Sequence, residues 1–238
     1  MTDSPPEPGR LAGGITRNAL QRDAVREAMR ARHPDVPLLE DDELRASMQG
    51  LLAHPPVAAD DVDGVWLFGY GSLLWNPCVE VVERRAAHLH GYHRDFRLRL
   101  TYGRGSPDAP GLMLGLVPGG SCKGVALRVP GRHLQRELLL VWRREMLTGV
   151  YEPRWIRLRT PTGPVPAIAF VVNPRHRCYC GSLDERTTVE LLATGHGLIG
   201  SAADYLEKTV AHLDEQGIHD RRLRRLRARV AARRGIRP

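Results

Sequence analysis

Short runs of hydrophobic residues dominate the middle of the chain. One of them, 92–101, alternates hydrophobic with polar positions and places Phe96, Leu98 and Leu100 on one face, as expected of a half-buried strand. Proline or glycine follows several of the other runs, which is typical of strand ends. The pattern predicts six strands, at residues 65–74, 92–101, 111–118, 123–130, 155–160 and 167–173.

Helical spacing is found on both sides of this strand-rich part and once within it. Near the N-terminus, for example, Leu20, Val25 and Met29 recur at loosely helical intervals. The predicted helices lie at residues 16–32, 41–53, 133–147, 184–195, 201–216 and 219–234. Strands followed by helices predict an α+β fold rather than alternating βαβ units. About six mostly antiparallel strands can close into a small barrel.

Composition and predicted secondary structure divide the chain into three parts. Residues 1–64 begin with proline and glycine and end in a linker-like segment, HPPVAADDVDG, and we interpret them as a helical leader. Residues 65–220 form the main domain, and residues 221–238 form a basic C-terminal helix and tail. Nothing in the leader indicates a chemical role, and we expect residues 1–60 to be dispensable for catalysis.

The formal charge of +8 comes from one end of the chain. Residues 221–238 contain nine arginines and no acid, so the rest of the 238-residue chain carries a net charge of about −1. Such a helix could dock on nucleic acid or on an acidic surface. Against this alternative, Leu223, Leu226 and Val230 form an apolar stripe, which predicts that the helix packs on the body and that its arginines face solvent. A bias toward arginine and alanine is also what a GC-rich bacterial genome produces.

Composition places the chain among folded proteins of a reducing compartment. Hydrophobic residues make up 42% and charged residues 26%, which excludes a mainly disordered or collagen-like chain. No apolar run reaches the roughly 18 residues of a membrane helix, and the N-terminus lacks a signal-peptide pattern. Four cysteines are too few for a disulfide scaffold, so we expect free thiols in the cytoplasm. We expect no metal at His88, His90 and His93 or at the Cys178-Tyr179-Cys180 run, since neither has the spacing of a ligand set.

The segment Phe68-Gly69-Tyr70-Gly71-Ser72-Leu73 is the first candidate for chemistry. Two glycines separated by one residue let the backbone turn sharply after a strand and present its N–H groups to a carboxylate or an oxyanion. The segment has neither the third glycine of a dinucleotide-binding loop nor the lysine of a nucleotide-binding P-loop. The alternative interpretation is a glycine-rich turn or bulge without a ligand.

Glu145 is the second candidate. It continues the apolar stripe of Leu138 and Val141 along the predicted helix 133–147, and an acid in line with buried positions is unusual. Arg143 and Arg144 precede it, but neighbouring residues on a helix do not face one another, so they need not neutralise the carboxylate. A carboxyl group there is suited to general acid–base catalysis. Alternatively, the helix ends by residue 146 and Glu145 reaches solvent.

Taken together, these segments resemble a known family. The motifs FGYGSLLW (68–75) and WRREMLTGVY (142–151) resemble those of the ChaC-type γ-glutamylcyclotransferases, and the similarity extends over about residues 65–220. The leader has no counterpart in the family core. Where the family has Gly-Gly-Tyr after its catalytic acid, this chain has Gly149-Val150-Tyr151.

The resemblance implies a fold, a reaction and a set of site residues. The fold would be a small closed antiparallel barrel with flanking helices, and residues 65–220 would be the catalytic domain. The reaction would convert glutathione into 5-oxoproline and cysteinylglycine, with glutathione as the only partner and with no cofactor, metal or obligate protein partner. Glu145 would act as general base and then as acid. The substrate-binding residues would be Leu67, Phe68, Gly69, Tyr70, Gly71, Ser72, Leu73 and Tyr151.

Overall fold

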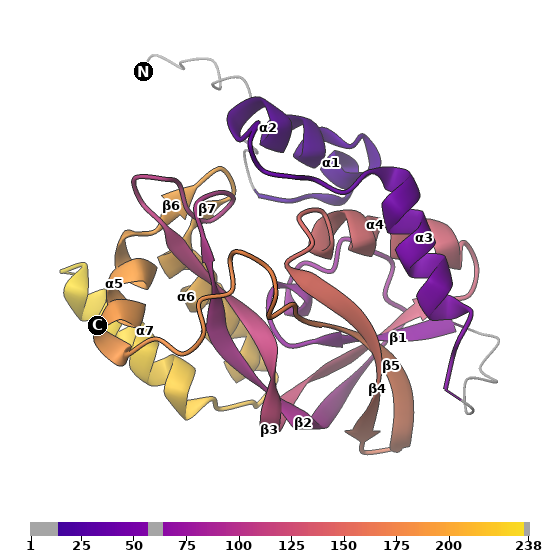
Figure 1. The fold of residues 1–238 in the computed structure, drawn as a ribbon. Coiled ribbons are helices and arrows are strands. Elements are labelled where there is room, and N and C mark those ends of the chain that lie inside the picture. Colours follow the sequence, from indigo (N-terminus) through magenta and orange to yellow (C-terminus); the bar gives the residue numbers. More distant parts are fainter. Residues whose placement is uncertain (1–13, 57–63, 236–238) are drawn as a thin grey trace, which may run out of the picture.

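Five strands close into a barrel at the centre of the computed structural model, which describes residues 14–56 and 64–235 (Figure 1). Neighbouring strands pair in the order β1-β3-β2-β4-β5. Four of these contacts are antiparallel, and the barrel closes where β1 lies parallel to β5. The strands are β1 (Gly64–Gly69), β2 (Glu83–Leu100), β3 (Gly111–Pro130), β4 (Tyr151–Thr160) and β5 (Gly163–Val172). The predicted small barrel is therefore confirmed.

Two differences from the predicted strands have local causes. The runs 111–118 and 123–130 belong to the single strand β3, because Gly119 and Gly120, with φ of 97° and 69°, bend the chain without ending its pairing with β2. In addition, β2 begins nine residues before the predicted position 92 and passes a bulge between His90 and Tyr92. Bends and bulges of this kind interrupt the hydrophobic pattern but not the strand.

Helices surround the barrel on several sides (Figure 1). The predicted leader helix 16–32 is interrupted between Gln21 and Ala24, where Asp23 has a φ of 59°. The remaining helices begin and end within two residues of the predicted positions. The helices are α1 (Arg17–Gln21), α2 (Ala24–Arg32), α3 (Asp41–Leu52), α4 (Leu134–Glu145), α5 (Glu185–Thr194), α6 (Ala202–Glu215) and α7 (Arg221–Arg233).

The leader packs against α4, as Figure 1 shows. Arg17 of α1 forms a two-pronged ion pair with Glu137 of α4, whose side chain is 6% exposed. Farther along α4, Arg143 pairs with Asp41 of α3 and donates to the carbonyl of Leu20 at 2.7 Å. The leader is therefore fastened at both ends of α4.

The basic helix α7 packs on the body through the predicted apolar stripe, since Leu223, Leu226 and Val230 are buried. Its outward arginines lie beside acids of β2, α5 and α6. Six of them form ion pairs: Arg222 with Asp95, Arg224 with Asp214, Arg225 and Arg229 with Glu185, Arg227 with Glu207, and Arg233 with Glu190. The positive charge of this helix is thus largely balanced within the chain. In the described residues, no helix is long and apolar enough to cross a membrane.

Candidate active site

Glu145 is the last residue of α4, and its side chain is only 13% exposed. The helix does end by residue 146, as one alternative proposed, but the carboxylate does not reach open solvent. It faces a cavity of about 270 Å³ between the barrel, α6 and the leader. Ser72 and Tyr151 line the same cavity. The structure therefore brings the two motifs together, although more than 70 residues separate them.

Arg144 pairs directly with Glu145, with Nε 2.8 Å from Oε1. The prediction that Arg144 need not neutralise Glu145 is wrong, because at the end of the helix the long side chain can fold back along its neighbour. Its guanidinium also donates to the carbonyl of Asn76 and lies 3.2 Å from Sγ of Cys78. Arg144 thus holds the catalytic candidate against the 76–78 loop.

The glycine-rich loop follows β1 and leads into a short 3₁₀ helix, η1 (Ser72–Leu74). Arg94 of β2 is buried and donates to the carbonyl of Tyr70 at 2.7 Å, which fixes the direction of the turn. A Cβ at Gly71 would lie 3.0 Å from the hydroxyl of Tyr205, so a side chain there would crowd the site. The amides of Ser72 and Leu73 open η1 and have no acceptor within it.

A narrow recess beside Glu145 is lined by five of the predicted substrate residues: Tyr70, Gly71, Ser72, Leu73 and Tyr151. The other three, Leu67, Phe68 and Gly69, stay within β1 and pair with β3. Leu67 and Phe68 are completely buried, so they support the loop from within the barrel and do not line the recess or the cavity. Residues 70–73 of the predicted segment therefore line the recess, whereas residues 67–69 support it from within β1.

Three buried tyrosines surround Glu145. Burial raises the pKa of Tyr205 to about 12 and is also the main reason why the pKa values of Tyr70 and Tyr151 lie well above the usual range. All three hydroxyls are protonated at neutral pH. Tyr151 donates to the carbonyl of Leu114 at 2.6 Å and Tyr70 to that of Phe170 at 2.8 Å. These two rings are held in place by the barrel and shape the recess.

Arg104 lines the cavity and was not found by the sequence analysis. Its guanidinium lies 4.7 Å from the ring centre of Tyr205 and has long contacts, at 3.4 Å, to the carbonyls of Ile199 and Ser201. Burial lowers the pKa of Arg104. It forms no ion pair within the described residues, so it is a cation available to a ligand. Arg104 lies between two strands, where no periodicity marks it.

The leader contributes one wall of the cavity, through Gly14, Ile15, Val25 and Met29. It also braces the loop that holds Arg144, since Asn76 donates from Nδ2 to the carbonyl of Ile15 at 2.6 Å. These contacts argue against the expectation that residues 1–60 are dispensable for catalysis.

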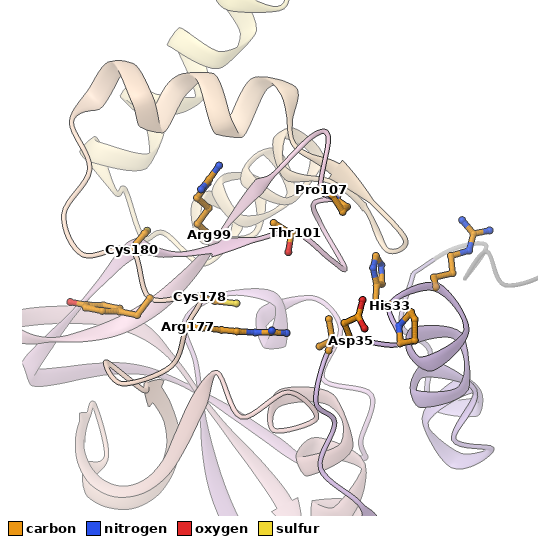
Figure 2. Close-up of a pocket in the computed structure, with 12 residues that line it drawn as sticks. His33, Asp35, Arg99, Thr101, Pro107, Arg177, Cys178 and Cys180 are labelled. Carbon is orange, nitrogen blue, oxygen red and sulfur yellow. The ribbon is translucent and has the colours of Figure 1, made fainter.

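A larger cavity, of about 600 Å³, lies elsewhere, between the leader and the barrel (Figure 2). Figure 2 shows Arg177 extending from the barrel side toward the leader, where His33 and Asp35 lie. The hydroxyl of Tyr102, which lines the Glu145 cavity, lies 3.3 Å from Sγ of Cys178 in the larger one. This second cavity is lined neither by Glu145 nor by any residue of the glycine-rich loop.

The histidines and cysteines considered as metal ligands do not come together in one site. The rings of His88 and His90 lie 4.1 Å apart, whereas His93 faces the carbonyl of Gly119. Cys178 is buried against Tyr102, and all four cysteines are free thiols. In the described part of the chain, no three or more His, Cys, Asp and Glu side chains are grouped to hold a metal ion.

Comparison with solved structures identifies the fold. A yeast γ-glutamyl cyclotransferase specific to glutathione superposes with a TM-score of 0.67 at 21% identity, covering 72% of this chain and 97% of the yeast chain. The fold is therefore that of the γ-glutamyl cyclotransferases. The family model of ChaC-like proteins matches residues 65–233, and the chain belongs to the ChaC family. This match includes most of the basic segment 221–238, which we had set apart from the main domain.

Two relatives differ in how much of the chain they match. The glutathione-specific γ-glutamylcyclotransferase of Escherichia coli (strain K12) is 40% identical over 207 residues, 87% of each chain. The glutathione-specific γ-glutamylcyclotransferase 1 of Mus musculus is 31% identical over 159 residues, 65% of this chain and 71% of its own. A match to 87% of the chain is too long to lie within residues 65–238, so the similarity to the bacterial relative includes part of the leader.

Proposed function

We propose that the chain is a lyase that degrades glutathione to 5-oxoproline and cysteinylglycine. The observation that carries this proposal is the mostly buried carboxylate of Glu145, which faces the glycine-rich loop across one cavity. The names of the ChaC relatives support the same reaction and substrate. We further propose that the protein acts in the cytoplasm, where glutathione is abundant and thiols remain reduced.

The reaction is an intramolecular acyl transfer. The α-amine of the γ-glutamyl group attacks the γ-carbonyl carbon, a five-membered ring closes, and the amide bond to cysteinylglycine breaks. A folded substrate brings amine and carbonyl together, so the protein supplies mainly orientation and proton transfer. The chemistry itself requires no cofactor, metal or covalent enzyme intermediate.

Glu145 performs the two proton transfers. The α-ammonium has a reference pKa of about 8, so at neutral pH it must lose a proton before it can attack. Glu145 takes that proton and later gives it to the leaving amine, which would otherwise be a poor leaving group. Arg144 keeps the carboxylate at the mouth of the recess during both transfers.

The loop and Arg104 bind the charged parts of the substrate. The amides of Ser72 and Leu73 at the start of η1 are suited to stabilise the negative charge that develops on the γ-oxygen. Arg104 is suited to pair with a substrate carboxylate, because it lines the cavity without an acid of its own. Tyr151 lines both the recess and the cavity, so it lies where the glutamyl group would meet Glu145.

The test is release of 5-oxoproline from glutathione, γ-glutamylalanine and γ-glutamyl-ε-lysine. Glu145→Gln should lower turnover of glutathione by about 10²–10⁴-fold while calorimetry still detects glutathione binding. The matched control is Glu207→Gln, because this acid on α6 is 61% exposed and does not line the cavity. Near-normal turnover by Glu145→Gln, or no release from any of the three compounds by the native protein, would overturn the proposal.

A further inference from the structure

We propose that the thiol of Cys78 holds Arg144 in place and, through Arg144, fixes the position of the Glu145 carboxylate. This inference rests on the proposed function and extends it to a residue that acts through its neighbour. Cys78 lines neither the cavity nor the recess beside Glu145. It is therefore a positioning residue for the reaction.

The backbone of Cys78 has an unusual conformation. Its φ of 60° lies in the left-handed region, which residues other than glycine seldom adopt. In the described part of the chain, Asp23 and His133 share this feature, but each of them directly precedes a helix, α2 and α4. Cys78 lies between η1 and β2, where no helix begins. Such a conformation persists only where the surrounding contacts enforce it.

The side chain of Cys78 makes the first set of these contacts. Its Sγ lies 3.2 Å from Nη1 of Arg144 and 3.1 Å from Oδ1 of Asn76. Burial is the main reason why the pKa of the thiol lies above its usual range, so the thiol is protonated at neutral pH. It can therefore accept a hydrogen bond from Arg144 while it donates one to Asn76. Asn76 in turn donates from Nδ2 to the carbonyl of Ile15.

The main chain of Cys78 is held by the leader. Nη1 of Arg17 lies 3.3 Å from the carbonyl oxygen of Cys78, and the same guanidinium pairs with Glu137 of α4. With 7% of its surface exposed, Cys78 is enclosed where the leader, the 76–78 loop and α4 meet.

Loss of the thiol would loosen Arg144. The guanidinium contacts the Glu145 carboxylate, the carbonyl of Asn76 and Sγ of Cys78. Because the guanidinium is a rigid plane, holding its Nη1 on the loop also sets the direction in which its Nε points toward Glu145. The side chain of Arg144 is only 5% exposed, so water has little access to replace a lost partner. A shift of Arg144 would therefore move the carboxylate.

The experiment measures kcat and KM for glutathione in the full-length protein and in variants of Cys78. Serine and alanine are similar in size, but only the hydroxyl of serine can accept and donate as the thiol does. Cys78→Ala should lower kcat by about 10-fold with KM unchanged, since a displacement of a full ångström costs about 10²-fold and Arg144 keeps its bond to Asn76. Cys78→Ser should retain most of the native kcat.

The matched controls are Cys180→Ala and Cys180→Ser. Cys180 is also a free thiol, and it lines neither the cavity nor the recess. A lower kcat in Cys78→Ala than in Cys78→Ser, with no such difference at Cys180, supports the proposal. Equal kcat values in the two Cys78 variants would overturn it, because a role in packing alone does not distinguish them. If Cys78→Ala fails to fold, Cys78→Gly replaces it, since glycine adopts a φ of 60° without strain and also lacks the thiol.

A double-mutant cycle separates this result from failure of the proposed function. Should the native protein release no 5-oxoproline from glutathione, the proposed function fails, and urea denaturation still tests the contact between Cys78 and Arg144. The cycle compares Cys78→Ala, Arg144→Met and the double variant. Non-additive changes in the free energy of unfolding support the proposal, and additive changes would overturn it.

Discussion

The leader and α7 both pack on helices that flank the barrel, but through ion pairs of different character. The leader's Arg26 and Glu137 of α4, the partner of the leader's Arg17, are almost completely buried, with side chains 4% and 6% exposed. In α7, Arg225, Arg229 and Arg233 are all more than half exposed. An exposed pair contributes little to stability, whereas breaking a buried one leaves a charge without a partner.

The number of charged residues in a segment therefore does not indicate how much that segment contributes to the candidate site. The arginine-rich α7 reaches the site only indirectly, through Asp220, its N-cap residue, which pairs with Arg94 behind the loop. The leader has a lower proportion of charged residues than α7 and no recognisable motif, yet it lines the cavity and braces Arg144. Four predictions test this contrast, from the largest expected effect to the smallest.

A chain that begins at Gly64 should lose at least about 10²-fold in kcat/KM for glutathione. Without the leader, the cavity lacks one wall and the 76–78 loop loses its contact with Ile15, so Arg144 and Glu145 shift. A misplacement of about 1 Å can cost that much. Circular dichroism of the shortened chain distinguishes this loss from unfolding of the barrel. Full turnover by the shortened chain would restore our initial expectation that the leader is dispensable.

Arg17→Ala should lower the free energy of unfolding by about 2–3 kcal/mol, because it leaves the buried carboxylate of Glu137 with only the amide of Glu80 as a donor. Urea denaturation measures the effect. Pairing Arg17→Ala with Glu137→Gln in a double-mutant cycle isolates the interaction, and additive effects of the two changes would show that the pair contributes nothing.

Attachment of the leader should weaken in acid. The hydrogen bond from Arg143 is the main cause that lowers the pKa of Asp41 to about 2, below its value of about 3.9 in the unfolded chain. A lowered folded-state pKa stabilises the folded protein above pH 4, and this contribution disappears as the pH falls from about 4 to about 2. Thermal midpoints measured across this range should fall less steeply for Asp41→Asn than for the native chain. Parallel curves would contradict the assignment.

Replacing Arg225, Arg229 and Arg233 together by glutamine should have the smallest effect on stability and none on turnover. Exposed pairs are each worth about 0–1 kcal/mol, so we expect a shift of about 1–2 kcal/mol in unfolding and unchanged kcat/KM. The same variant tests the nucleic-acid alternative. Binding of the native chain to DNA that weakens steeply between 50 and 200 mM salt and disappears in the variant would revive that alternative.

Most helices and strands of the fold can be predicted from the sequence. Hydrophobic periodicity locates the helices closely because an amphipathic helix buries one apolar stripe against the rest of the fold, as Leu223, Leu226 and Val230 do in α7. It divides β3 in two because Gly119 and Gly120 interrupt the pattern while hydrogen bonding with β2 continues. Pairing between strands is a long-range property that a local pattern does not record.

The candidate site was predicted only where local signals exist. Glu145 is marked by its place in a buried stripe, and Gly71 by its motif. Arg104 has neither signal, since its role follows from a loop that folds over Tyr205. The leader residues Val25 and Met29 look like ordinary core positions, and only the packing of the leader on α4 turns them into a cavity wall.

The separation between the leader and α4 along the chain also has a consequence for biosynthesis. Asp41 and Arg143 are 102 residues apart, so the leader leaves the ribosome long before its partner helix exists. At about 5–20 residues per second, the delay is roughly 5–20 s. Helices as short as α1 and α2, of five and nine residues, are not stable alone during that interval. The nascent leader must therefore wait with Val25 and Met29 exposed, and a chaperone that shields short apolar segments would find its substrate there.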